Sequence, residues 1–367
     1  MTDNQHTRLL PLVGLAIAGL AGVRLAQGLQ RLTAGRPRSG LNLRQRVDEV
    51  ERWFGGEAVY EALPTAVYPP GSMGMLAPLG WLGEGTLTAY TVVTLLACTA
   101  LGWGFRRIAG AGPWWLTLAP LATLAVSDGM ALGQLHLVTL VATVGALGLA
   151  LRGEPRDDLG AGLLFAVALI KPSSAVLFIP ALGLLPRRTH ALTVAAGVYG
   201  LATWLACAVR EESPLRLVRQ WWFRAAEGAR YGAEMAGYGS VHDLVGWLSI
   251  PRGSVVATLL VLSAGTLWTL RVRRADPWVV VGVLGIAARM GTYHRGYDDV
   301  LVLPAVAALL RVGDTRERLV AVLVWSLLLV DVPGVVRTLS WLVALGSLML
   351  SARGGGEEGR AGARATT

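Results

Sequence analysis

The stretch Leu163–Leu185, LLFAVALIKPSSAVLFIPALGLL, consists of two apolar runs separated by Lys171 and Pro172. Lys171 is the only lysine in 367 residues. An ammonium group at the end of an apolar helix is unfavourable unless it pairs with an anion, lines a polar cavity or reaches the membrane interface. The stretch therefore indicates a broken membrane helix and marks Lys171 as a candidate functional residue. A lysine that merely reaches the interface would give the same pattern.

The whole chain has the composition of a membrane protein. Hydrophobic residues make up 53% of it and charged residues only 16%, whereas soluble domains carry roughly 25% charged residues. About twelve apolar segments follow one another, and several are shorter than the ~20 residues that a perpendicular membrane helix needs. We therefore predict an all-α fold, a polytopic transmembrane helical bundle of about 10–13 spans.

Several other classes of protein are disfavoured. Cys98 and Cys207 both lie in apolar stretches, so neither a disulfide nor a thiolate metal site is expected. The net charge of +9 could suggest nucleic acid, but the arginines cluster between apolar segments, where they would meet lipid headgroups. No P-loop or serine-hydrolase motif is present. We expect membrane lipids as partners, no nucleic acid, no metal and no cofactor.

The arginine-rich loops predict the topology. They fall on every second connection, at 106–107, 152–156, 187–188, 271–274 and 311–318. The positive-inside rule places such loops in the cytoplasm. We therefore predict a multi-pass cell-membrane protein with both termini in the cytoplasm. Residues 1–351 would form one integral membrane domain, with extracytoplasmic loops at about 28–75 and 210–253, and 352–367 would be a disordered cytoplasmic tail.

Most of the other ionisable residues then gather at the predicted outer face. His294 lies among Arg289, Arg295, Asp298 and Asp299, and a histidine beside carboxylates is suited to proton transfer or phosphate contact. Each motif also has a structural interpretation. A tyrosine before two prolines, as at Tyr68, suits the headgroup region, and Gln134 with His136 could simply form hydrogen bonds between helices.

Four segments in a fixed order resemble a known family. They are 42–82 (NLRQRVDEVERWFGGEAVYEALPTAVYPPGSMGMLAPLGWL), 128–151 (DGMALGQLHLVTLVATVGALGLAL), 162–180 (GLLFAVALIKPSSAVLFIP) and 293–304 (YHRGYDDVLVLP). Over about residues 40–310 the chain resembles glycosyltransferase family 87. These are membrane-embedded C-type glycosyltransferases that use polyprenyl-phosphate-linked sugars, typified by mycobacterial phosphatidylinositol mannoside mannosyltransferases.

The resemblance implies a C-type architecture and an inverting transfer on the extracytoplasmic face. A sugar, mannose in the typical members, would pass from a polyprenyl-phosphate donor to a lipid or glycan acceptor. This chemistry needs a base for the acceptor hydroxyl and cations for the departing phosphate. The family usually shows Asp-Leu-Arg where this chain has Asn42-Leu43-Arg44. An amide cannot accept a proton at neutral pH, so we expect Asp48, the nearest carboxylate, to replace Asn42 as the base, with Glu49 behind it.

The resemblance also implies a donor-binding group. Lys171, Arg44 and His294 match positions expected to hold the donor phosphate, and His294 counts among the candidate catalytic residues. Tyr68 and Gln134 would shape the sugar pocket, and the donor site would also include Tyr297 and Asp298.

Two other functions stay open at this point. A catalytically degenerate homologue that only binds lipid-linked sugars is favoured by Asn42. A transporter or flippase is compatible with many spans and a helix broken at Lys171. Against a carrier, the sequence shows no clear internal repeat, and its charges lie near one interface instead of the midplane.

Overall fold

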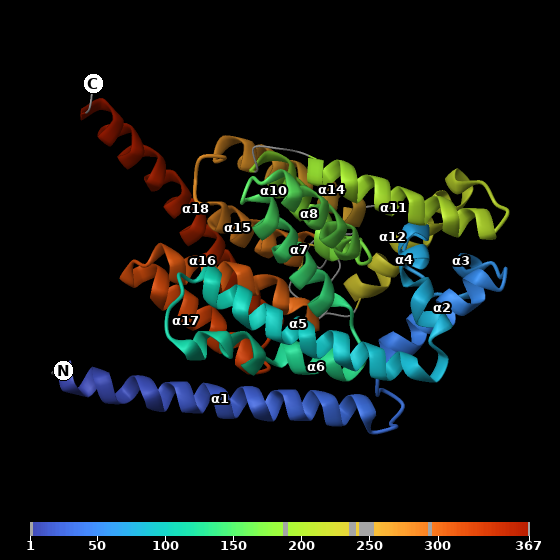
Figure 1. The fold of residues 1–367 in the computed structure, drawn as a ribbon, viewed down its shortest axis with the longest axis horizontal. Coiled ribbons are helices and arrows are strands. Elements are labelled where there is room, and N and C mark those ends of the chain that lie inside the picture. The colour runs from blue at the N-terminus through green and yellow to red at the C-terminus, as the bar shows by residue number, and fades with distance from the viewer. Residues whose placement is uncertain (1–2, 186–189, 235–239, 242–252, 293–295, 366–367) are drawn as a thin grey trace.

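The computed structural model describes residues 3–185, 190–234, 240–241, 253–292 and 296–365. In this part of the chain the regular elements are helices and there is no strand (Figure 1). The predicted all-α helical fold is therefore confirmed. The predicted loop residues 187–188, most of the second half of the loop 210–253, and His294 lie outside the described residues.

The longer helices follow one another along the chain. They are α1 (Asp3–Thr33), α2 (Leu41–Phe54), α4 (Pro70–Trp81), α5 (Thr86–Ile108), α6 (Leu124–Leu132), α7 (His136–Ala150), α8 (Pro155–Ala168), α11 (His190–Val209), α12 (Pro214–Glu234), α14 (Gly253–Arg271), α15 (Pro277–Gly291), α16 (Leu303–Val312), α17 (Thr315–Leu329) and α18 (Gly334–Ala365). Short helices connect them: α3 (Val59–Ala62), α9 (Pro172–Ala175), α10 (Ile179–Leu184), and the 3₁₀ turns η1 (Gly83–Gly85), η2 (Trp114–Thr117), η3 (Ala119–Ala122), η4 (Val176–Phe178) and η5 (Gly296–Val302).

Fewer helices than expected are long enough to cross a membrane alone. In the described residues there are four: Pro11–Thr33, Gly83–Ile108, His190–Val209 and Gly334–Ala352. A fifth arises if α6 and α7, which meet at a bend of 119°, form one broken span. The prediction of about 10–13 spans treated every apolar segment as one crossing. Proline and glycine divide several of these segments into short helices, as at Lys171-Pro172.

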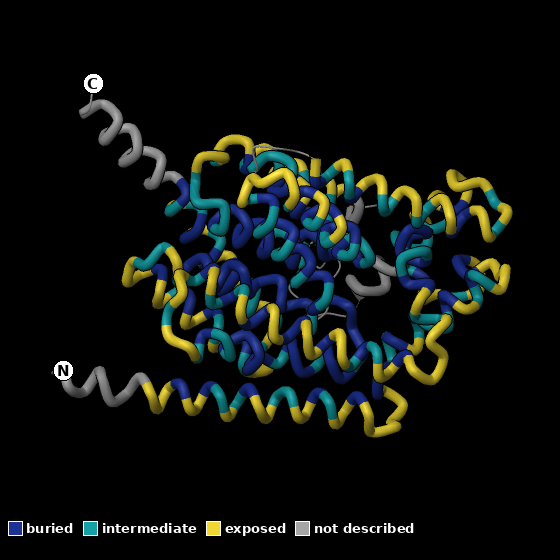
Figure 2. The backbone as a smooth tube through the Cα atoms, in the orientation of Figure 1, coloured by how far each residue is buried: buried dark blue, intermediate teal, exposed yellow. Residues whose placement is uncertain are grey.

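Helices α15 and α16 lie at the centre of the bundle, and α5 and α11 lie nearer its periphery. Many residues of α15 and α16 are fully buried, whereas large apolar side chains of α5 and α11 point outward, for example Leu96 (65% exposed) and Trp204 (60% exposed) (Figure 2). Broken helices are tolerated at membrane depth only where other protein segments cover their backbone. The arrangement is therefore the one expected of a membrane bundle with an internal site.

Glycines allow the closest helix contacts. A Cβ at Gly74 of α4 would collide with the Ala202 carbonyl oxygen of α11, and a Cβ at Gly162 of α8 would collide with Val194 of α11. Small residues at helix contacts let backbones approach closely, which strengthens van der Waals packing in lipid. Helix α11 is thereby fixed against both α4 and α8.

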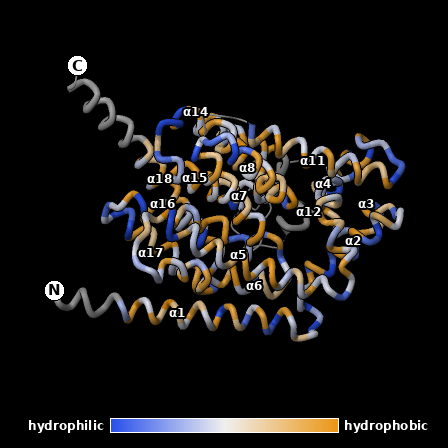
Figure 3. Tube along the Cα trace, in the orientation of Figure 1, coloured by the Kyte–Doolittle hydropathy of each residue, from blue (hydrophilic) through white to orange (hydrophobic). Residues whose placement is uncertain are grey.

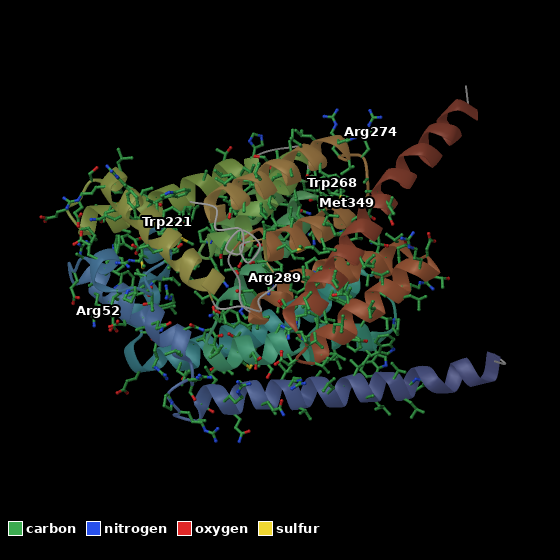
Figure 4. The ribbon with its side chains drawn as sticks, turned by 180° about the vertical axis from the view of Figure 1, so that it is seen from behind. Arg52, Trp221, Trp268, Arg274, Arg289 and Met349 are labelled. Carbon is green, nitrogen blue, oxygen red and sulfur yellow. The ribbon has the colours of Figure 1, made fainter. Side chains whose placement is uncertain are left out.

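The bundle has two opposite ends, and different parts of the chain form each of them. Both termini lie at one end, and α2, α3 and α12 lie at the other (Figure 1). Hydrophilic stretches concentrate at these two ends (Figure 3). Arg52 and Trp221 lie at the end formed by α2 and α12, and Arg274 lies at the opposite end (Figure 4). The side of the membrane that each end faces remains a prediction.

The C-terminal segment differs from the expectation of disorder. Helix α18 continues through residues 352–365. This stretch contains no proline, but five of its fourteen residues are glycine, which disfavours helix, so its composition does not explain the helix.

Candidate functional site

The first long loop is docked onto the break between α6 and α7. Gly133 ends α6 in the left-handed conformation (φ 73°), and Gly40, which precedes α2, is also left-handed (φ 57°). The Gly40 amide donates a hydrogen bond to the Ala131 carbonyl at 2.9 Å. A Cβ at Gly133 would lie 2.6 Å from the Leu43 side chain. These contacts orient α2 so that one face is buried.

The buried face of α2 carries an ion pair. Arg46 and Glu49 are one helical turn apart and pair with each other. Arg46 also donates to the Thr65 carbonyl at 3.0 Å and lies over the Tyr68 ring, 4.5 Å from its centroid. Glu49 is fully buried. Burial raises the pKa of Glu49 to about 7, although the Arg46 charge opposes the shift. A carboxyl group with such a pKa can exchange a proton near neutral pH.

Asp48 and Arg44 lie on the other face of α2. The Asp48 side chain is 50% exposed and accepts a hydrogen bond from Arg52 at 2.9 Å. Arg44 is exposed and donates to the carbonyls of Ser39 and Pro37. Both residues therefore point away from the buried group. Asn42 lies partly buried at the start of α2.

Tyr68 connects α2 to the centre of the bundle. Burial raises its pKa to about 12, so its hydroxyl stays protonated, and the charges of Arg46, Asp298 and Glu49 all act on it. Its carbonyl accepts a hydrogen bond from the Tyr60 hydroxyl at 2.7 Å. Two prolines follow, and Pro70 begins α4. Proline at the first helical position is pre-organised for a helix start.

Lys171 lies in the chain break between α8 and α9. Its ammonium group forms a buried ion pair with Asp298 of η5, and the two side chains are 9% and 4% exposed. The ammonium also lies 5.6 Å from the centroid of the Tyr297 ring. Thr292, just after α15, donates a hydrogen bond to the Ser173 carbonyl at 2.9 Å, which holds the break against α15. The structure thus brings together three predicted site residues: Lys171, Tyr297 and Asp298.

The α6–α7 break supplies a further aromatic neighbour. His136 begins α7, is fully buried and lies 5.8 Å from Tyr297, measured between ring centroids. A Cβ at Gly129 would collide with the His136 ring, so this position needs glycine. Gln134 is buried in the break itself, and its carbonyl accepts a hydrogen bond from the Tyr90 hydroxyl at 3.0 Å.

Asp299, next to Asp298, is held from the other side. Its two carboxylate oxygens accept hydrogen bonds from Arg289 at 2.6 Å and from Arg337 at 3.0 Å. Arg337, in the first turn of α18, also pairs with Asp331 at 2.6 Å. Arg289 is buried in the middle of the bundle (Figure 4). The position of η5 is therefore set by charges on α15 and α18 as well as by Lys171.

A cavity of about 830 Å³ borders this group. Tyr297 and Asp299 form part of its wall, which also contains four arginines and two further aspartates: Arg31, Arg36, Arg38, Arg337, Asp128 and Asp331. Arg31 of α1 pairs with Asp128 of α6 at 2.6 Å across one side. Tyr297 therefore lines the cavity, and its ring also lies near Lys171 and His136. A polar cavity with arginines can take an anionic group.

Sequence reasoning found part of this group. It did not single out Arg46 or Arg337, and it named Glu49 only as the carboxylate behind Asp48. The helical periodicity of Leu43, Arg46, Val50 and Trp53 could have shown that Arg46 lies on the buried face of α2. No sequence signal linked Arg337 to Asp299. Within the described residues no cluster of three or more His, Cys, Asp or Glu side chains could hold a metal ion.

Comparison with known proteins gives one match. The model of glycosyltransferase family 87 matches residues 66–331. No curated protein and no solved structure matches the chain. The matched range contains Lys171, Tyr297, Asp298 and Asp299, whereas α2 and Arg337 lie outside it.

Proposed function

Because this chain belongs to glycosyltransferase family 87, a family of membrane glycosyltransferases, we propose that it transfers a sugar from a polyprenyl-phosphate donor to a lipid or glycan acceptor. We take mannose as the sugar, inversion as the stereochemical course and the extracytoplasmic side as the location of the reaction. The site is the buried group formed by Lys171, Tyr297 and Asp298 together with Arg46, Glu49 and Tyr68.

The observation that carries this proposal is the position of the only lysine. Its ammonium is buried at a helix break and is paired through one of its three N–H bonds with Asp298. The remaining donors and the nearby Arg46 suit a phosphate that gains negative charge as it leaves. An isolated buried ammonium would be unfavourable, so Asp298 stabilises Lys171 before substrate binds.

The reaction also needs a base. The acceptor oxygen attacks the anomeric carbon, the bond from that carbon to the phosphate oxygen breaks, and the phosphate departs with the electron pair. The acceptor proton must then go to a carboxylate. Glu49 is a better candidate than Asp48, because it lies on the buried face of α2 beside Arg46 and Tyr68 and its pKa is about 7. Asp48 is half exposed and paired with Arg52.

A direct assay tests the proposal. Protein in lipid nanodiscs is incubated with radiolabelled polyprenyl-phosphate-mannose and a lipid extract, and new glycolipids are separated by thin-layer chromatography. We expect a labelled product with wild-type protein and none with Lys171→Ala. Absence of product with any polyprenyl-phosphate sugar, together with measurable donor binding, would instead favour the second candidate function.

That second candidate is a binding protein for lipid-linked sugars. Asn42 favours it, because this position usually holds aspartate in the family and an amide cannot take up the acceptor proton. Glu49 favours the enzyme, because it supplies a carboxylate on the buried face of α2, close to Tyr68, whereas Asp48 lies on the other face.

A further inference from the structure

A second hollow lies along the C-terminal half of α5. It is a groove of about 440 Å³ between α5, α7 and α16, and Trp278 of α15 lies in its wall. Along α5 it runs from Ala100 to Ile108, a length of about 12 Å at the rise of an α-helix. These residues form the second half of α5, which ends away from α2 (Figure 1).

Two glycines keep the groove open. A Cβ at Gly104 of α5 would meet only Val144, at 4.0 Å, and a Cβ at Gly148 of α7 would meet only Trp278, at 3.8 Å. Both separations are ordinary van der Waals contacts. Both glycines therefore border the groove, and larger side chains at these two positions would extend into it.

One end of the groove is cationic. Arg107, in the last turn of α5, and Arg152, just after α7, both line it. The Arg107 guanidinium lies over the Trp103 ring, 5.2 Å from its centroid, and Trp103 is 59% exposed. Arg152 has Asp157 as a neighbour, but at 3.9 Å. Tryptophan and arginine together at the end of an apolar helix are typical of the headgroup level of a membrane.

We propose that this groove binds one anionic phospholipid, with an acyl chain between α5 and α7 and its phosphate between Arg107 and Arg152. An apolar channel that ends in two arginines complements both parts of such a molecule. Basic pockets between transmembrane helices are sites for anionic headgroups. A zwitterionic lipid would bring the positive charge of its headgroup close to the two arginines and would bind less well.

Native mass spectrometry of the full-length protein tests this. The protein is released from nanodiscs of phosphatidylglycerol and phosphatidylcholine in equal amounts, and the lipids that remain bound are counted. Wild type should retain one phosphatidylglycerol. Gly104→Leu/Gly148→Leu should lose it by filling the groove. Arg107→Gln/Arg152→Gln should weaken its binding at least about tenfold, because charge-assisted hydrogen bonds to the phosphate are lost.

Matched controls separate the groove from general effects. Gly197→Leu/Gly200→Leu places the same side chains on α11, where an added Cβ meets nothing within 4 Å. Arg273→Gln/Arg274→Gln removes two arginines that do not line the groove. Both controls should keep the bound lipid. The proposal is overturned if wild type shows no preference for phosphatidylglycerol, if it retains a polyprenyl lipid in its place, or if the groove variants retain as much lipid as the controls.

Discussion

Replacing Lys171 separates its role as a counter-ion from its role as a phosphate ligand. Lys171 and Asp298 are 9% and 4% exposed in their side chains, so Lys171→Ala leaves a buried carboxylate without its ammonium partner. Breaking a buried pair in this way destabilises a protein by about 3–5 kcal/mol. Lys171→Ala/Asp298→Asn removes both charges and should restore most of that stability.

Donor binding should respond differently from stability. A charge-assisted hydrogen bond to a phosphate contributes about 1.5–3 kcal/mol, which corresponds to a loss of about 10- to 150-fold in affinity. We expect this loss in Lys171→Ala and again in the double variant. The free energy of unfolding is measured by titration with sodium dodecyl sulfate, and the donor dissociation constant by equilibrium binding in nanodiscs.

The double variant gives the decisive result. If its donor affinity returns to the wild-type value, Lys171 acts only by neutralising Asp298, and the reasoning that gives it the phosphate is refuted. Asp298→Asn alone serves as the control, because it keeps the ammonium and removes only the opposing charge.

Three other perturbations follow from the same geometry. The rate of transfer should rise with pH through about 7 as Glu49 ionises. Glu49→Gln should abolish transfer, whereas Asp48→Asn should leave the pH–rate profile unchanged. If Glu49→Gln keeps the wild-type rate and pH–rate profile, Glu49 is not the base. Arg337→Gln should lower the free energy of unfolding by about 1–3 kcal/mol, because Asp299 of η5 loses a hydrogen-bond donor. An SDS titration that shows no change would contradict a stabilising role for this hydrogen bond. Cysteine at Thr65 should react with an impermeant maleimide in intact cells and cysteine at Arg316 should not, against a background in which both native cysteines are buried; the reverse labelling would invert the predicted topology.

Candidate site residues could be predicted from the sequence where the local sequence is chemically unusual. A lone lysine before a proline in an apolar run identified the break at Lys171. The family resemblance implied Asp298 as a donor-site residue, and the structure pairs it with Lys171. The choice of Asp48 followed only its nearness to Asn42 in the chain. The helical face of α2 favours Glu49 instead, because Arg46, Glu49 and Val50 are buried whereas Asp48 is half exposed.

Other features depend on contacts between distant segments. Arg337 and Asp299 are 38 residues apart, and nothing in either local sequence indicates that they pair. The number of spans was also not predictable from hydropathy. Segments such as the one around Gly133 turn within the protein interior, where other helices cover the exposed backbone.

The shared carboxylate of Asp299 has a consequence for biogenesis. Its first partner, Arg289, precedes it by only ten residues and is made and inserted with it, so the two opposite charges enter the bilayer together and neutralise each other. Insertion of a lone charge would be much less favourable. Arg337 belongs to α18, which is synthesised after the segment that carries Asp299. The segment that carries Asp298 therefore gains its full set of charged partners only after α18 has been made, and a ribosome-bound nascent chain that lacks α18 should be inserted but inactive.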